Sequence, residues 1–225
     1  MKSNSKPPLM TSIFLGLSIL VYLFMIIVYG TSTDSRVLLQ VGAKFNYLMI
    51  NENQWWRLIS AAFIHIGFTH LLLNGISIYF MGLELEPLLG KLRFSIIYLG
   101  AAIGGNLFSF AFNPLNISAG ASTSIFGLFA SFIGLGYLFP QSKEIKARAS
   151  NFMILIALNF INSLRNTDID NWGHFGGALF GLLFTLLVCL PSKSDNKKRI
   201  YILLGILLAM VVLLLYGFYN FNRVI

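Results

Sequence analysis

The sequence predicts an all-α protein that crosses a lipid bilayer several times. Of its 225 residues, 56% are hydrophobic and only 11% are charged, whereas soluble domains carry about a quarter charged residues. The apolar residues come in long uncharged runs, such as 11–29, rather than in short amphipathic periods. These observations exclude a soluble globular protein and leave room only for short loops.

Seven stretches are long and apolar enough to be transmembrane helices, which need about 20 residues each. They are 11–29, 60–82, 94–113, 119–139, 149–164, 172–190 and 200–220. No small-residue cleavage site follows the first stretch, so we predict an uncleaved helix rather than a signal peptide. The chain therefore divides into an N-terminal tail (1–10), a six-helix core (11–190) and a basic linker with a seventh helix (191–225).

The basic residues predict the orientation of these helices. With the N-terminus in the cytoplasm, the inner segments hold eleven Lys and Arg and the outer segments hold five, while the acidic residues divide four and four. This distribution follows the positive-inside rule. We expect a multi-pass protein of the plasma membrane or an equivalent bilayer, with a cytoplasmic N-terminus and an outer C-terminus.

The net charge of +8 is accounted for by these loops, so the predicted partner is the lipid bilayer and not nucleic acid. The single Cys189 can form neither an intrachain disulfide nor a cysteine zinc site. Three histidines raise the question of a metal site. No carboxylate or cysteine accompanies them inside the outer half of the spans and no His-Glu-x-x-His motif occurs, so we expect no metal and no cofactor.

The first outer segment, about residues 30–58, is the longest loop and carries recurring apolar and aromatic residues. Segments of this composition lie in the membrane interface, with aromatic rings at headgroup level. We expect short interfacial helices there. Arg57, beside Trp56, is either an interfacial anchor or a residue that organises the loop.

Polar residues gather near the starts of the second, fourth and sixth spans, all of which run inward from the outer face. Polar side chains inside a membrane are costly and are functional candidates. They include His65, His70 and Asn74 in the second span, Ser122 in the fourth and His174 in the sixth. A serine, a histidine and hydrogen-bond donors at one depth are the components of an acyl-transfer site.

Helical spacing adds detail to these clusters. His70 and Asn74 are four residues apart and share a helix face, with His65 expected about one turn further out. Gly173, Gly177 and Gly181 recur every four residues and favour close approach of a neighbouring helix. Ser122 and Phe126 are also four apart, which suits stacking of the phenyl ring on the imidazole of His174.

These motifs resemble those of the rhomboid family of intramembrane serine proteases. The resemblance covers about residues 35–185. The matching motifs are Gln54-Trp55-Trp56-Arg57, His65-x4-His70-x3-Asn74, Gly82-x3-Glu86-x3-Gly90, Gly120-Ala121-Ser122 and His174-x2-Gly177-x3-Gly181. The resemblance implies a six-helix rhomboid-like bundle plus one additional C-terminal transmembrane helix. It also implies substrates that are themselves transmembrane proteins, cleaved in or beside their membrane spans.

Site roles follow from the same resemblance. It implies a dyad of Ser122 as nucleophile and His174 as base, without a third member, and an oxyanion hole that uses the side chains of His70 and Asn74 and the N–H of Ser122. Supporting roles are implied for His65, Phe126, Gly177, Gly181, Trp56 and Arg57. Asp170, four residues before His174, is expected in the outer loop, and Glu86 is expected to be solvated or to cap a helix on the cytoplasmic side.

One position departs from the family pattern, which often has Gly directly after the nucleophile where this chain has Thr123. A side chain there either alters the local backbone or narrows the substrate groove. Other interpretations remain open: Ser122 as a packing residue, and His70, Asn74 and His174 as partners in interhelical hydrogen bonds. The alternative function is a non-proteolytic rhomboid-like binder of membrane clients.

Overall fold

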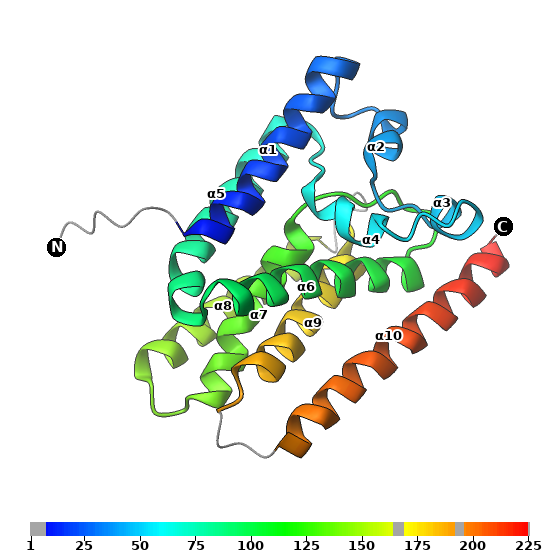
Figure 1. Cartoon of the computed structure of the whole chain (residues 1–225). Helices are drawn as coiled ribbons and strands as arrows, with labels where there is room; N and C mark the ends of the chain where they lie inside the picture. The colour runs from blue at the N-terminus through cyan, green and yellow to red at the C-terminus, as the bar shows by residue number, and fades with distance from the viewer. Residues whose placement is uncertain (1–7, 164–168, 192–195, 225) are drawn as a thin grey trace.

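The computed structural model describes residues 8–163, 169–191 and 196–224, and its regular elements are all helices (Figure 1). They are α1 (Leu9–Tyr29), α2 (Ser35–Val41), α3 (Asn46–Asn51), α4 (Arg57–Ser60), the 3-10 helix η1 (Ala61–Phe63), α5 (Gly67–Leu89), α6 (Lys91–Phe112), α7 (Ser122–Leu138), α8 (Lys143–Ser163), α9 (Asn171–Cys189) and α10 (Asn196–Val224). The predicted all-α class is confirmed.

Within the described residues, five helices are long and apolar enough to cross a bilayer: α1, α5, α6, α9 and α10. Helix α7 is apolar but has only 17 residues. Helix α8 has 21 residues but begins with a charged stretch over 143–148. Length and composition therefore support five of the seven predicted spans.

The predicted second span, 60–82, is wrong in its position along the chain. Helix α5 begins at Gly67 and continues to Leu89. Ile64 and Ile66 are extended and Gly67 has a φ of 78°, a left-handed conformation that glycine adopts without strain, so the backbone turns before the helix starts. His65 therefore precedes the helix instead of lying on it, while Glu86 lies within the helix and not after it.

The other predicted spans correspond to helices with shifted ends. The largest shift is at α8, which begins at Lys143 rather than at 149. The predicted end of that span, residue 164, lies outside the described residues, as do residues 1–7 of the predicted tail and 192–195 of the predicted linker. The first outer segment contains the short helices α2, α3 and α4, as predicted.

Helices α6, α7 and α9 form the centre of the bundle because glycines let their backbones touch. A Cβ atom added at Gly181 of α9 would overlap the Cα atom of Gly127 in α7, and one added at Gly104 of α6 would overlap the ring of Phe180 in α9. Small residues allow such close helix packing in membranes, where apolar burial alone drives little association. Around this centre, α8 packs on α7, and α10 packs on α6 and α9 (Figure 1).

Helix α1 packs on α5, and a carboxylate anchors its first turn. Glu86 is buried and accepts hydrogen bonds from the N–H groups of Met10 (2.9 Å) and Thr11 (2.8 Å) and from the Thr11 hydroxyl (2.8 Å). The first N–H groups of a helix lack intrahelical partners, and a negative charge there is favourable. Of the two expectations for Glu86, helix capping is confirmed and solvation is wrong.

Candidate active site

Ser122 and His174 are in direct contact. Nε2 of His174 lies 2.8 Å from Oγ of Ser122, although the two residues are 52 positions apart in sequence. Ser122 is the first residue of α7 and His174 is in the first turn of α9. The backbone contact between these two helices brings their N-terminal ends together, which explains how a serine and a histidine from separate spans meet.

The segment before Ser122 is held from several sides. The N–H of Gly120 donates to the carbonyl of Ala61 (2.9 Å), and the N–H of Ala121 donates to Nε2 of His65 (3.4 Å). Gly120 has a φ of 134°, and a Cβ atom there would lie 2.8 Å from Nε2 of His70. Glycine is required at this point both for the backbone conformation and for the close approach of the imidazole.

His174 is positioned by its own helix and by an aromatic ring. Phe126 of α7 stacks on the imidazole, with ring centroids 4.4 Å apart and an interplanar angle of 12°. Asp170 precedes α9 and accepts a hydrogen bond from the N–H of Gly173 (3.1 Å), while its carbonyl accepts from the N–H of His174 (3.0 Å). Asp170 is thus an N-cap, a common role for aspartate.

His70 and Asn74 of α5 line the same cleft as Ser122 and His174, which has a volume of about 740 Å³. Nδ1 of His70 accepts a hydrogen bond from the N–H of Ile66 (3.3 Å), so in the neutral imidazole the proton is on Nε2, the atom beside Gly120. The side-chain Nδ2 of Asn74 is buried and has no hydrogen-bond partner among the described residues. Both side chains therefore carry an N–H donor at the cleft that Ser122 also lines.

His65 does not line the cleft. It is fully buried, accepts the N–H of Ala121 through Nε2, and places Nδ1 3.3 Å from the carbonyl of Phe63. The two contacts are compatible with one neutral tautomer that carries its proton on Nδ1. His65 thus holds the backbone next to Ser122.

The two residues directly after Ser122 are buried between helices, and Thr123 also lines the cleft. The Ser124 hydroxyl donates to the carbonyl of Tyr98 in α6 (2.9 Å), so this side chain is turned away from Ser122 and His174. The Thr123 side chain is 3% exposed and packs against Gly105 of α6 and Gly173 of α9. Its methyl and hydroxyl groups fill the contact between three helices, and its Oγ1 has no hydrogen-bond partner.

Besides His65, four more of the predicted supporting residues lie away from the cleft. Gly177 and Gly181 are at the contact with α7, where a Cβ atom at Gly177 would overlap the carbonyl oxygen of Thr123. Arg57 is buried, stacks over the half-exposed Trp56 ring at 4.8 Å and donates to the carbonyl of Ala43 (2.7 Å). Burial lowers the pKa of the Arg57 guanidinium. These contacts favour the loop-organising interpretation of Arg57 over that of a simple interfacial anchor.

A buried lysine near the site was not identified from the sequence. Lys44 pairs with Ser118 through two backbone hydrogen bonds of 2.9 and 3.0 Å, and Ser118 lines the cleft. Its Nζ donates to the carbonyl of Asn113 (3.0 Å). Burial lowers the pKa of Lys44 from 10.5 to about 7, and the Asp170 carboxylate acts in the opposite direction. A lone lysine in a loop gives no sequence signal of burial, because lysines are mostly exposed.

Comparisons with known proteins identify the family and relatives of this chain. The family model described as "Rhomboid domain" matches residues 52–191. Rhomboid protease GluP of Bacillus subtilis (strain 168) is 33% identical over 96% of this chain and 42% of its own length. Rhomboid-like protease 1 of Toxoplasma gondii is 30% identical over 88% of this chain and 72% of its own length. RHOMBOID-like protein 2 of Arabidopsis thaliana is 33% identical over 82% of this chain and 62% of its own length.

This chain spans less than half the length of GluP. The matched region contains both residues of the Ser122–His174 contact and all the helices that line the cleft. Together with the apolar helices, these matches identify an integral, multi-pass membrane protein. The chain belongs to the rhomboid family.

Proposed function

We propose that this protein is an intramembrane serine endopeptidase that hydrolyses peptide bonds in or beside the transmembrane segments of other membrane proteins. The observation that carries the proposal is the 2.8 Å contact between His174 Nε2 and Ser122 Oγ. A serine hydroxyl is a weak nucleophile until an adjacent base accepts its proton, and this distance is within the range needed for that transfer.

In the first half of the reaction, Ser122 Oγ attacks the substrate carbonyl carbon while its proton passes to His174 Nε2. The tetrahedral intermediate collapses when His174 returns that proton to the leaving amine, which breaks the C–N bond and leaves an ester on Ser122. Stacking on Phe126 at 4.4 Å keeps the imidazole in place for both transfers. The mechanism requires no third residue, and Asp170 serves as the cap of α9.

The oxyanion of each tetrahedral intermediate is stabilised by the Nε2–H of His70, the Nδ2–H of Asn74 and the N–H of Ser122. The supporting observations are the tautomer of His70 and the unpartnered amide of Asn74. The start of α7 adds free N–H groups and the positive end of a helix dipole. A donor that has no partner before the reaction gains one as the charge develops, which lowers the barrier.

The second half of the reaction needs water. A water molecule gives a proton to His174 and attacks the ester carbon, and the ester bond to Ser122 breaks as His174 returns the proton to Oγ. The cleft, with a volume of about 740 Å³, has room for water molecules of about 30 Å³ each.

The hydrogen bonding of the substrate backbone also constrains the substrate. In a helix the carbonyl groups are already hydrogen-bonded and shielded from attack. We expect substrates whose spans unwind locally at Gly, Pro or polar residues near the outer boundary, with small residues at the scissile bond.

The proposed setting is the plasma membrane, with a cytoplasmic N-terminus, an outer C-terminus and a cleft that opens toward the outer face. The charge distribution among the loops supports this orientation. We also propose the six-plus-one arrangement, in which α7 and α8 complete a core of six spans and α10 is the additional helix. No cofactor or metal takes part in this mechanism.

The test is cleavage of a single-span model substrate by the purified protein in lipid vesicles. Ser122→Ala and His174→Ala should each lower kcat by about 10⁴-fold or more, as for other serine proteases that lose a catalytic group. Ser124→Ala is the matched control, since that hydroxyl bonds to Tyr98 and not to the dyad. It should retain activity within a few-fold.

If the wild type cleaves none of several helix-breaking substrates but binds them as strongly as the two variants do, the peptidase proposal is wrong. The protein would then be a membrane-client binder. Cleavage that survives Ser122→Ala would equally contradict the dyad.

A further inference from the structure

The C-terminal end of α6 is held by asparagine side chains from two distant segments. The last four carbonyl groups of a helix lack partners within the helix. In α6 the carbonyl of Phe110 accepts a hydrogen bond from Nδ2 of Asn46 in α3 (2.8 Å). The next carbonyl, that of Ala111, accepts one from Nδ2 of Asn220 in α10 (2.9 Å). Phe110 and Ala111 are fully buried, so water has little access to these two carbonyl groups.

Asn220 follows a long apolar run in α10. Residues 200–219 contain no charged or amide side chain, and many of them are exposed apolar residues suited to lipid. Asn220 itself is partly buried, and a buried side-chain amide is costly unless it is hydrogen-bonded. The bond to the carbonyl of Ala111 therefore fixes the end of α10 against the end of α6 (Figure 1).

Aromatic packing supports this contact one turn earlier in α10. The ring of Phe218 lies 5.8 Å from the ring of Phe110 and 5.7 Å from that of Trp55. The rings of Trp55 and Phe110 are 5.5 Å apart. Gly217 allows this approach, because a Cβ atom there would overlap the Phe110 ring. The last turns of α10 therefore contact both the end of α6 and the segment before α4.

The segment that follows α6 forms one wall of the candidate active-site cleft. Residues 116–119 line the cleft, and the chain then continues to Ser122. Lys44 holds this segment near both ends. Its Nζ donates to the carbonyl of Asn113, the residue after α6 (3.0 Å), and its backbone pairs with that of Ser118. Because the wall starts where α6 ends, its position depends on the position of that end.

We propose that Asn220 is a positioning residue. By fixing the end of α6, it sets the position of residues 116–119 and so shapes the part of the cleft that receives the substrate peptide. Its effect on cleavage rests on the proposed function, whereas its effect on the segment after α6 does not. The additional helix α10 thereby contributes to the cleft and is more than an apolar anchor.

The effect is confined to substrate binding. Between the wall and Ser122, the N–H groups of Gly120 and Ala121 make their own hydrogen bonds to residues 61–65 (2.9 and 3.4 Å). These bonds hold the chain next to Ser122 independently of α10. A shift of residues 116–119 therefore changes how a peptide fits the cleft but leaves the geometry at Ser122 intact.

The first test measures hydrogen–deuterium exchange by mass spectrometry on the whole chain in lipid nanodiscs. Asn220→Leu keeps a similar side-chain volume but removes the donor. Peptides that cover 113–121 should then exchange about fivefold faster than in the wild type, the size expected for loss of one hydrogen bond. Exchange in α7 and α9 should stay at the wild-type rate.

Asn222→Leu is the matched control for the exchange measurement. Asn222 lies two residues further along α10 and is exposed, so the same change of residue type there should leave exchange unchanged throughout the chain. Gly217→Leu is a second variant that keeps the side chain of Asn220. Its added side chain displaces the Phe110 ring, so it should also raise exchange over 113–121.

The second test measures cleavage of the single-span model substrate in lipid vesicles. Asn220→Leu and Gly217→Leu should raise KM about fivefold and leave kcat within about twofold of the wild type, because they alter binding and not the chemical step. A merely structural role would reduce the fraction of folded enzyme. It would therefore lower the apparent kcat and leave KM unchanged.

Unchanged exchange over 113–121 in Asn220→Leu would overturn the proposal, because the end of α6 would then hold the wall without α10. Faster exchange that extends over α6 and α9 would also overturn it, since Asn220 would then belong to a general anchor of α10. A lower kcat at unchanged KM would contradict the role in binding. If the wild type cleaves no substrate, the peptidase proposal fails, and the exchange rates still decide whether Asn220 positions the segment after α6.

Discussion

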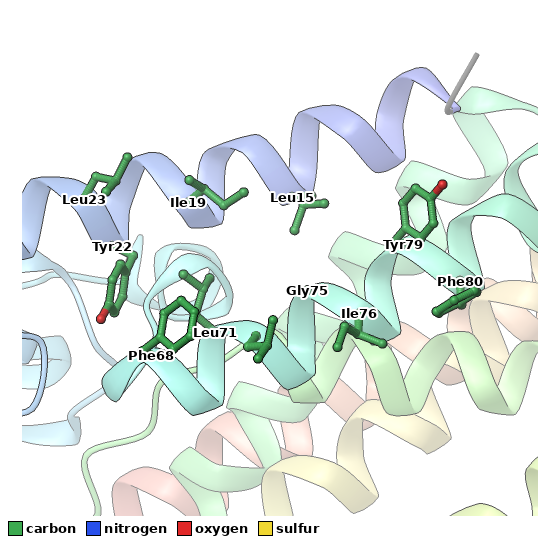
Figure 2. A pocket seen from close by; sticks show the side chains of 11 residues that line it. Leu15, Ile19, Tyr22, Leu23, Phe68, Leu71, Gly75, Ile76, Tyr79 and Phe80 are labelled. Carbon is green, nitrogen blue, oxygen red and sulfur yellow. The ribbon is translucent and has the colours of Figure 1, made fainter.

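The two halves of the candidate site are held in different ways. The Ser122–His174 pair lies on α7 and α9, where Cβ atoms added at Gly177 or Gly181 would overlap backbone atoms of α7. The two side-chain donors lie on α5, where Gly75 meets only the end of the Leu15 side chain. One half is fixed by contacts between backbones, and the other rests on adaptable side-chain contacts between α1 and α5 (Figure 2).

Short loop contacts join the halves. The N–H of Ala121 donates to His65, the N–H of Gly120 donates to Ala61, and Lys44 pairs with Ser118. Under the proposed mechanism, Ser122 and His174 are preorganised before substrate arrives. The proposed stabilisation of the oxyanion then depends on how α5 is supported. The two contributions should therefore be separable by mutation.

The largest effect is expected when the backbone contact is broken. Gly181→Leu places side-chain atoms where the Gly127 backbone now lies, so α7 and α9 must move apart. Overpacking of this kind costs about 1–3 kcal/mol or more, and separation of the dyad should lower kcat/KM by about 10⁴-fold, as for loss of a catalytic group. Cleavage assays and thermal unfolding in detergent measure the two effects.

Gly205→Leu is the matched control for this prediction, because its added side chain meets open space on α10. It should unfold at the wild-type temperature and cleave at the wild-type rate. If Gly181→Leu retained more than a tenth of the wild-type activity, the backbone contact between α7 and α9 would not be what holds Ser122 and His174 together.

A smaller and purely catalytic effect is expected on the α5 side. Asn74→Ala should lower kcat by about 100–1,000-fold, the usual result of removing one oxyanion donor. Its KM and unfolding temperature should stay close to those of the wild type, because the Nδ2 atom has no partner to lose.

Ser77→Ala, one turn further along the same helix, is the control for Asn74→Ala. Ser77 also lines the cleft, but its hydroxyl donates to the carbonyl of Leu73 (2.9 Å). It should cleave at nearly the wild-type rate. A parallel loss of stability and activity in Asn74→Ala would point instead to a structural hydrogen bond.

Local sequence patterns correctly predicted the long helices and some of the contacts in the candidate site. Apolar runs predicted the long helices within a few residues at most of their ends, and the i, i+4 spacing of Ser122 and Phe126 correctly anticipated the stack on His174. The glycine repeat of α9 likewise indicated a close neighbour. These features depend on periodicity, which the sequence contains directly.

The remaining features depend on contacts between distant parts of the chain. Glu86 accepts a hydrogen bond from the N–H of Met10, 76 residues earlier in the first turn of α1, and no local pattern predicts that partner. The predicted start of α5 was wrong because a hydropathy pattern gives no sign of the left-handed backbone at Gly67. In the sequence, Lys44 looks like an ordinary loop lysine. Its burial follows from a contact with Ser118, which lies far away in the sequence.

The smallest effect concerns Lys44, at the junction of the two halves. Burial lowers its pKa from 10.5 to about 7 in the folded protein, whereas the unfolded chain keeps an ordinary lysine. Between these values the unfolded state binds more protons, so stability should rise with pH, by at most about 1.4 kcal/mol per pH unit. Below pH 7 both states are protonated and Lys44 adds no pH dependence.

Thermal unfolding in detergent at pH 6, 7, 8 and 9 measures this contribution as a difference between variants. Lys44→Met removes the buried ammonium, so the rise above pH 7 should be weaker than in the wild type. Lys91→Met, at an exposed lysine of α6, should leave the wild-type rise unchanged and controls for the loss of one charge. Identical pH profiles for all three proteins would mean that Lys44 keeps an ordinary pKa, and hence that water reaches this junction. The two halves would then be joined through a hydrated loop and not through a buried one.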